Sequence, residues 1–495
     1  MSSAGTTRDF AGDVSGQAVG ATWRRWAGLV VVCMAVFLEA MNLSSISIQI
    51  PALIVDFHLA TTTAQLIVST FLVAYAGFLL LGGRIADWLG RRLVFVSGVT
   101  LFGLASLAAG LAANVVLLVV ARAVQGLGAA MTAPAAMSII TVTFREGPER
   151  NRALAIFGMI GASGFAIGAV VAGVLTSWLN WRWAFFDYVI IAALVLLFTP
   201  MLVAKDRRSS STKQSIDFFG AILSTAGLLI LVYTVGEVQA LPVVQVIAGL
   251  VLAIILLAIF VAIEARVRVP LLPFRVFRLP TLTSANILAL AEYAVLICVV
   301  FIATLYMQNV LGYTPFQTGL AFLPLGAMAI LAANVMPSLL GRLGIKPALL
   351  IGLVLMAIGS ALASALISVD GNFWIVVLIP TVLVGAGSGM AIPATMVAAV
   401  AGAADTDQGL VSGLITTSGQ LGGAIGLALV ILTATLFTPL VTGAHPQALA
   451  IRQALVSGFR PALLVITAFA VLGLLLASAS FRSRRAPKEA SERET

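Results

Sequence analysis

The sequence predicts an all-α membrane protein with fourteen transmembrane helices, arranged as two parallel six-helix repeats with an inserted helix pair. The 495-residue chain is 61% hydrophobic and only 9% charged, whereas soluble domains carry roughly 25% charged residues. Its apolar residues form runs long enough to cross a bilayer, and nearly all of its basic residues fall on one side of those runs. In addition, segments from the two halves of the chain match in sequence.

The apolar runs define the predicted helices in chain order. A spanning helix needs about 20 mostly apolar residues, and within a bilayer a helix satisfies its backbone hydrogen bonds internally. Fourteen runs meet this requirement. They cover residues 26–50, 66–86, 93–113, 115–142, 151–178, 183–203, 217–237, 242–263, 281–311, 316–341, 347–367, 374–400, 409–438 and 461–481.

The positions of Lys and Arg predict how these helices are oriented. With the N-terminus in the cytoplasm, all 28 Lys and Arg residues lie in cytoplasmic segments except Arg122, Arg182, Arg452 and Arg460. Because the number of helices is even, both termini are predicted to be cytoplasmic. Topology then explains the net charge of +9, and the scattering of basic residues over short loops argues against a nucleic-acid partner.

Three pairs of segments indicate an internal duplication. They are GLGAAMTAPAAM (126–137) with GAGSGMAIPATM (385–396), LGRRLVFVSG (89–98) with LGIKPALLIG (343–352), and ASGFAIGA (162–169) with TSGQLGGA (417–424). The matched segments run in the same direction across the membrane, so the repeats are parallel. The predicted domains are a cytoplasmic tail (1–25), an N-terminal bundle (26–205), a linker with the inserted helices (206–270), a C-terminal bundle (271–481) and a cytoplasmic C-terminal tail (482–495).

The loop after the second predicted helix has the pattern G-x-x-x-D-x-x-G-R-R, formed by Gly83, Asp87, Gly90, Arg91 and Arg92. Glycines permit a tight turn and close helix approach, and Asp87 can pair with the arginines or lie at a helix N-terminus. At these residues the chain resembles the major facilitator superfamily, whose signature loop has this form. The resemblance implies a cytoplasmic gate, and the alternative is a plain capping or topogenic role for Asp87.

The fourth predicted helix contains an arginine within the membrane. Arg at the centre of a spanning helix costs about 2.5 kcal/mol or more, so Arg122 must face protein or water and find an anion. Arg122, Gln125, Gly126 and Gly128 resemble the family's fourth-helix motif R-x-x-Q-G-x-G, in which the Arg is implicated in proton transfer. A purely structural ion pair is the alternative.

Further segments resemble one branch of this family. The fifth helix is similar to the drug-antiporter motif G-x-x-x-G-P-x-x-G-G, with Ala169 in place of the proline and Ala172 in place of one glycine. NWRWAFF (180–186), QNVLGYTPFQTGLAFLP (308–324) and GLVSGLITTSGQLGGAIG (409–426) are also similar. Over nearly residues 26–481 the chain therefore resembles the fourteen-span drug:proton antiporters, and this resemblance implies the major facilitator fold.

Glu39 lies within the first apolar run, FLEAMNLSSISIQIP. At ~1.5 Å per residue it lies about 20 Å past Trp26, near the bilayer midplane. Glu39, Asn42, Ile46 and Gln49 share one helix face. The resembling family usually has an Asp at the position of Asn42, one turn away. We therefore expect Glu39 to bind a proton or a cationic substrate near Arg122, and the alternative is a structural carboxylate.

Two other carboxylates are predicted within the membrane. Glu292, beside Tyr293, is near mid-depth of the ninth helix and is a candidate for proton coupling. Asp187 begins the sixth helix and is either a further coupling residue or a partner of Arg182 at the membrane edge. The polar groups predicted to line a substrate cavity are Asn42, Gln49, Tyr75, Gln125, Tyr293 and Gln420.

Together these features predict a proton-coupled exporter of lipophilic, cationic drugs in a bacterial cytoplasmic membrane. The expected partners are a small-molecule substrate, protons and the lipid bilayer, with the chain acting as a monomer. The proton gradient takes the place of a cofactor, because no G-x-x-x-x-G-K-[ST] loop occurs, and no metal site or enzymatic activity is expected. The alternatives are an exporter of one metabolite, antibiotic or lipid, and a non-transporting membrane sensor or scaffold.

Overall fold

The computed structural model describes residues 9–144, 147–204, 218–238, 241–267, 281–400, 408–439 and 447–480, and all regular structure within them is helical. Fourteen helical segments are long and apolar enough to cross a membrane, as the sequence predicts. The first half contains α1 (Asp9–Phe57), α2 (Thr61–Leu89), α3 (Arg91–Gly110), α4 (Val115–Thr143), α5 (Pro148–Trp178) and α6 (Trp183–Leu202). The inserted pair is α7 (Phe218–Gly236) and α8 (Val243–Glu264).

The second half contains α9 (Leu282–Asn309), α10 (Pro315–Ala321), α11 (Leu323–Leu343), α12 (Ile345–Leu366), η2 (Trp374–Leu378), α13 (Ile379–Val400), α14 (Gln408–Phe437) and α15 (Ala448–Ser480). Two of its spans are built from two pieces. The tenth span joins α10 to α11 at Phe322, and Pro324 lies in the first turn of α11, where its missing N–H has no helical partner to lose. The twelfth joins the π-helical turn η2 to α13.

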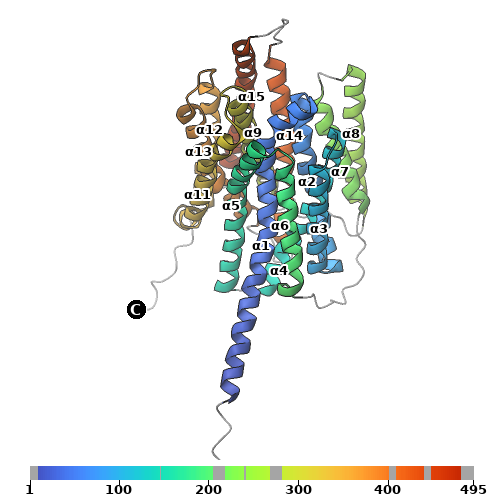
Figure 1. The fold of residues 1–495 in the computed structure, drawn as a ribbon, viewed down its shortest axis with the longest axis vertical. Helices are drawn as coiled ribbons and strands as arrows, with labels where there is room; N and C mark the ends of the chain where they lie inside the picture. Colours follow the sequence, from blue (N-terminus) through green and yellow to red (C-terminus); the bar gives the residue numbers. More distant parts are fainter. Residues whose placement is uncertain are drawn as a thin grey trace, which may run out of the picture.

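Two helix ends differ clearly from the sequence prediction. α1 begins at Asp9 rather than near residue 26, and it extends beyond the bundle as a single long helix (Figure 1). α15 begins at Ala448 rather than at residue 461, so Arg452 and Arg460 are helical and Pro461 lies inside the helix. Hydropathy identifies only the part of a helix that lies in lipid, so it does not predict polar extensions of that helix. The predicted tail 482–495 and the first part of the predicted linker, 206–217, lie outside the described residues.

The two halves repeat one packing pattern. In the first half α1 packs against α5 and α6, α2 packs against α4, and α3 packs against α4 and α6. In the second half α9 packs against α14 and α15, α11 packs against α13, and α12 packs against α13 and α15. Each contact in the first list has its counterpart in the second, so the duplication in the sequence corresponds to a duplication in the structure.

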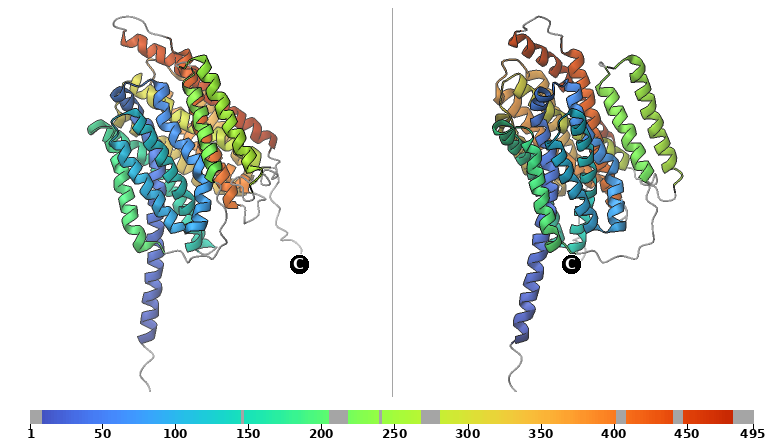
Figure 2. Two further views of the ribbon diagram at one scale, coloured as in Figure 1. Left: turned by 90° about the vertical axis from the view of Figure 1, so that its right-hand side faces the viewer. Right: turned by 45° about the vertical axis from the view of Figure 1, so that its right-hand side comes forward.

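The halves meet along three seams. α1 contacts α9, α2 contacts α14, and α5 contacts both α10 and α11. The α7–α8 hairpin stands beside the bundle (Figure 2), where α7 packs against α2 and α14 and so covers one seam. We call the end of the bundle where α2 passes into α3 the tail end, and the end where α1 passes into α2 the far end.

Candidate functional site

Arg122 forms the centre of a buried polar network in the first half. Its side chain is fully buried, its Nε donates to the backbone oxygen of Ile67 at 2.8 Å, and its Nη1 donates to the side-chain oxygens of Asn42 and Gln125, each at 2.8 Å. The guanidinium carbon also lies 4.5 Å from the centroid of the Phe71 ring. Within the described residues its hydrogen-bond partners are neutral oxygens, so the expected pairing with an anion is not present in this conformation.

Two further contacts extend this network. Gln125 donates through Nε2 to the Ser106 hydroxyl at 2.8 Å, which ties α4 to α3. Gln49 lies two turns beyond Asn42 on α1 and donates to Ser45 at 2.8 Å. The predicted polar face of α1 is therefore internal, and its amides make contacts within the first half.

Glu39 lies close to this network but contacts Tyr75 instead of Arg122. Its side chain is buried, and the Tyr75 hydroxyl donates to its Oε2 at 3.4 Å. Its Oε1 has no hydrogen-bond partner among the described residues. Asn42, one helical turn further along α1, takes the place beside Arg122. Within the described residues, one carboxylate oxygen therefore remains available for a further hydrogen bond.

Glu292 is the corresponding carboxylate of the second half. It is buried in α9, and the Thr395 hydroxyl of α13 donates to its Oε1 at 2.6 Å. Its Oε2, like the Oε1 of Glu39, has no partner among the described residues. The next residue, Tyr293, packs against α14 so tightly that a Cβ at Gly419 would lie 2.8 Å from its ring.

Glu39 and Glu292 lie on corresponding helices of the two halves, α1 and α9, a relation that sequence reasoning missed. On α5, a Cβ at Gly164 would lie 3.1 Å from the Cβ of Ala40, the residue after Glu39. On α14, the matching Gly419 faces Tyr293, the residue after Glu292. Gly164 and Gly419 belong to a matched pair of segments, so the two glutamates lie in the same region of the two repeats. The internal repeat in the sequence could therefore have indicated the relation between Glu39 and Glu292.

Tyr75 and Tyr293 link the surroundings of the two carboxylates. Tyr75 on α2 contacts Glu39 and also lies within electrostatic range of Tyr293 on α9. Gln420 on α14 is buried with its Oε1 unpartnered among the described residues. Of the predicted cavity residues only Tyr293 is partly exposed, so a substrate reaches this region only after the two halves separate.

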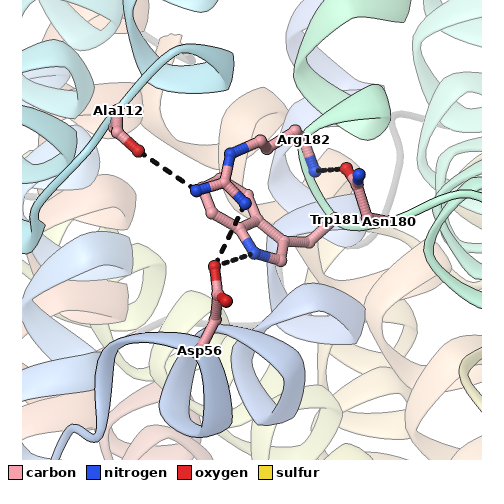
Figure 3. A network of polar contacts seen from close by, with 5 residues as sticks. All are labelled: Asp56, Ala112, Asn180, Trp181 and Arg182. Atoms are coloured by element: carbon pink, nitrogen blue, oxygen red, sulfur yellow. Dashed lines mark hydrogen bonds and ion pairs between the residues drawn. The ribbon is translucent and has the colours of Figure 1, made fainter.

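Asp187 does not pair with Arg182, and that alternative is wrong. Figure 3 shows Arg182 turned toward Asp56 at the far end, where Nη1 lies 3.1 Å from Oδ2. Trp181 donates to the same oxygen at 3.0 Å, and Arg182 Nη2 donates to the backbone oxygen of Ala112 at 3.4 Å. Asp56 ends α1, so this network ties α1 to the loops before α4 and α6. Both carboxylate oxygens of Asp187 have no partner among the described residues.

The predicted gate residues lie at the tail end, where α2 turns into α3. Gly90 has φ 103° and forms the single-residue connection, a conformation that favours glycine. Asp87 is exposed and within electrostatic range of Arg91. A Cβ on Gly83 would be in ordinary contact with Pro134, whereas one on Gly82 would collide with the backbone oxygen of Ala130. The glycine that the close approach of α2 and α4 requires is therefore Gly82, which the motif did not indicate.

The sequence profile of the Major Facilitator Superfamily matches residues 32–427 and, in a second alignment, residues 287–495. The chain belongs to the major facilitator superfamily. Its similarity to individual members extends over most of the chain. A cephamycin export protein of Amycolatopsis lactamdurans is 37% identical over 82% of this chain and 84% of its own length. A puromycin resistance protein of Streptomyces alboniger is 34% identical over 92% of this chain and 90% of its own.

Further superfamily members support the same assignment. A tetracenomycin C resistance and export protein of Streptomyces glaucescens is 30% identical over 83% of this chain and 76% of its own length. Among solved structures, a POT family transporter in complex with 5-aminolevulinic acid matches with a TM-score of 0.67 at 16% identity, covering 92% of this chain and 97% of its own. These relatives are transporters rather than enzymes, and the structural likeness shows that this chain has the superfamily fold.

One prediction concerns the seam between α5 and the tenth span of this superfamily member. A Cβ at Gly319 on α10 would collide with the backbone oxygen of Ala169 on α5. We expect Gly319→Val to separate the halves at the far end, since neither backbone can move without shifting its helix. In a background lacking Cys33 and Cys298, a cysteine at buried Ile48, whose backbone oxygen accepts a hydrogen bond from Gln308 of α9 at 3.1 Å, should then react with a membrane-impermeant maleimide roughly tenfold faster, as a shifted conformational population requires.

The matched control is Gly341→Val on α11, where a Cβ would meet nothing within 4 Å. It should leave the labelling rate at position 48 unchanged. Equal labelling of the two valine variants would show that the α5–α10 contact does not keep the far end closed.

Proposed function

We propose that this protein exports lipophilic antibiotics from a bacterial cell in exchange for protons, by alternating access between its two halves. The observation that carries the proposal is the pair of buried carboxylates on corresponding helices, Glu39 and Glu292, each with one oxygen that has no partner among the described residues. A buried carboxylate is costly in a membrane and is retained where it serves a pathway. Two such groups facing the seam can take up protons in one state of the transporter and release them in the other.

Four relatives support the choice of substrate class. They are named for cephamycin export, puromycin resistance, lincomycin resistance, and tetracenomycin C resistance and export. We propose an antibiotic or related natural product as the substrate. In this proposal the tail end and both termini face the cytoplasm, the protein acts as a monomer, and Asp87, Arg91 and Arg92 belong to the cytoplasmic gate.

A dedicated exporter of one antibiotic is the second candidate. Each of these four relatives carries the name of a single compound or compound class. A panel assay distinguishes the two candidates. Inverted membrane vesicles containing the protein, with an acidic interior, are incubated with each compound in turn, with or without a proton ionophore. Ionophore-sensitive accumulation of several unrelated compounds supports a multidrug exporter, and accumulation of one supports a dedicated exporter. Accumulation that the ionophore leaves unchanged would contradict proton coupling.

Glu292 offers a test of the preference for cationic substrates. We expect Glu292→Gln to reduce transport of cationic compounds by roughly tenfold while transport of neutral compounds falls less, because a carboxylate in a medium of low dielectric constant attracts a cation strongly. The Thr395 hydroxyl can still donate to the amide oxygen, so the local packing is kept. Initial rates in the same vesicles give the comparison, and equal losses for both classes of compound would contradict a role in cation recognition.

A further inference from the structure

The segment that joins α9 to α10 lies at the far end, where the second half meets α1 and α5. We call residues 308–316 the α9–α10 strap. It runs from the last turn of α9 to the first turn of α10, with the sequence QNVLGYTPF. The buried carboxylates and the network around Arg122 give this strap no role, so its contacts need an explanation of their own.

The strap is built as a rigid part of the second half. The backbone N–H of Leu311 donates to the backbone oxygen of Tyr306 at 3.1 Å, within α9. The N–H of Tyr313 donates in the same way to Met307 at 2.8 Å. Gly312 lies between them with φ 73°, a conformation that glycine adopts without strain. Because its turn is fastened to α9, the strap should move with the second half as one body.

One end of the strap contacts α1 of the first half. Gln308 lies in the last turn of α9, and its Nε2 donates to the backbone oxygen of Ile48 on α1 at 3.1 Å. The side chain of Gln308 is half-buried, so its amide is directed at the other half rather than fully into solvent. This hydrogen bond can exist only while α1 and α9 are close together at the far end.

The other end of the strap is completed by α5 of the first half. The first N–H groups of a helix lack partners within that helix. At the start of α10, Thr314 and Gln317 satisfy one another through a capping box, and Pro315 has no N–H. The remaining N–H, that of Phe316, donates to the hydroxyl oxygen of Ser177 on α5 at 2.9 Å. A serine of one half thus caps a helix of the other.

Close packing accompanies this hydrogen bond. A Cβ at Gly173 on α5 would lie 2.6 Å from the backbone oxygen of Pro315, and the ring of Trp178 lies 5.7 Å from the ring of Phe316. The two helices that receive the strap, α1 and α5, also pack against one another. Both ends of the strap therefore rest on one helix pair of the first half.

We propose that the α9–α10 strap is the far-end gate and that Gln308 and Ser177 are the positioning residues that hold it closed. The inference rests on alternating access, which belongs to the proposed function. Ser177 is exposed and Gln308 is half-buried, so water can take over both hydrogen bonds when the gate opens, and opening costs little. Both contacts join neutral groups, so the gate follows the positions of the two halves and does not itself respond to pH.

The test measures the distance across the far end by double electron–electron resonance. It uses the purified full-length protein with Cys33 and Cys298 replaced by alanine. Spin labels are attached at Val55→Cys in α1, where the side chain is 73% exposed, and at Asp370→Cys in the exposed turn before η2. Separation of the halves at the far end should appear as a second, longer distance.

We expect Ser177→Ala and Gln308→Leu each to raise the ratio of the longer to the shorter distance roughly threefold, as loss of one hydrogen bond generally allows. The double variant should raise it roughly tenfold, because contacts at opposite ends of a rigid segment add. Ser177→Thr keeps the hydroxyl and should behave as the parent protein does. The matched control is Ser163→Ala on α5, whose hydroxyl donates within its own helix to Ile160 at 2.8 Å, and it should also leave the ratio unchanged.

Three results would overturn the proposal. The first is a double variant with the same ratio as Ser163→Ala, and the second is a Ser177→Thr variant that opens as far as Ser177→Ala. In both cases the longer distance is still observed, so alternating access would stand while the strap would lose its role. The third is a single distance in every sample, with and without an imposed proton load, which would count against alternating access as well.

Discussion

Transport driven by a pH gradient is expected to fall to background when Glu39 is replaced by glutamine. Glutamine has nearly the shape of glutamate, and its amide oxygen can still accept the hydrogen bond that Tyr75 donates. It cannot carry a proton. We expect gradient-driven accumulation to fall by at least about tenfold. A positioned proton-transfer group generally contributes roughly hundredfold or more to a rate, so a loss of this size is a conservative expectation.

The chain offers a matched control for this variant. Glu237, directly after α7, is also a buried carboxylate, but its oxygens accept hydrogen bonds from Thr62 at 3.3 Å and Thr63 at 2.9 Å, at the start of α2. Glu237→Gln changes a buried charge by the same amount at the far end, where α7 meets the start of α2. It should preserve gradient-driven transport.

Two measurements in the same vesicles distinguish a role of Glu39 in proton coupling from a role in substrate binding. Substrate exchange without a pH gradient should continue in Glu39→Gln if the group only carries protons, whereas accumulation against a gradient should stop. Gradient-driven accumulation at the wild-type rate would remove Glu39 from the coupling mechanism. Loss of both activities, with exchange retained in Glu237→Gln, would instead assign Glu39 to the substrate site.

The sequence predicts the number of spans, their order and their duplication well, because each depends on composition summed over about 20 residues. It predicts the ends less well. α1 and α15 continue into polar sequence at Asp9 and Ala448, and nothing in hydropathy distinguishes a polar helix from a polar loop. The break of the tenth span at Phe322 has a local signal, Pro324, but a proline inside a membrane helix is equally compatible with a kink.

The candidate site was predicted as a set of residues but not as a set of contacts. The free-energy cost of placing a charged side chain within a bilayer is enough to single out Arg122, Glu39 and Glu292 in the sequence, because such residues are rare there. Their partners depend on how helices far apart in the chain are rotated about their axes. Asn42 rather than Glu39 meets Arg122 because α1 presents that turn to α4. In the same way, Arg182 pairs with Asp56, which lies in another helix.

The surroundings of Arg122 lead to the second large expected effect. Its hydrogen-bond partners in the described residues are neutral, so its buried charge is stabilised by dipoles and by the Phe71 ring rather than by a counter-ion. Replacing it by methionine removes a burial cost of about 2.5–3.5 kcal/mol. The same change leaves the side-chain oxygens of Asn42 and Gln125 without this donor, at about 1–3 kcal/mol each. These two contributions to the free energy of unfolding are of similar size and opposite sign.

Arg122→Met is therefore expected to unfold within a few degrees of the parent protein, by thermal unfolding in detergent, and yet to lose at least about tenfold in gradient-driven transport. Arg122→Lys should lose transport as well, because an ammonium group lacks the planar fork that reaches Ile67, Asn42 and Gln125 together. A large drop in thermal stability for the methionine variant would mean that the arginine holds the fold, and its role in transport would then have no support from this experiment.

Arg122 has no anionic partner among the described residues, so we propose that its charge meets one in another state of the cycle. Glu39 is a candidate, because it lies one helical turn from Asn42 and keeps one oxygen unpartnered among the described residues. If a proton leaves Glu39 when it approaches Arg122, the two residues act as one unit. The double variant Glu39→Gln/Arg122→Met should then transport no worse than either single variant, within about twofold, since coupled residues are non-additive. Additive losses would mean that the two groups act in separate steps.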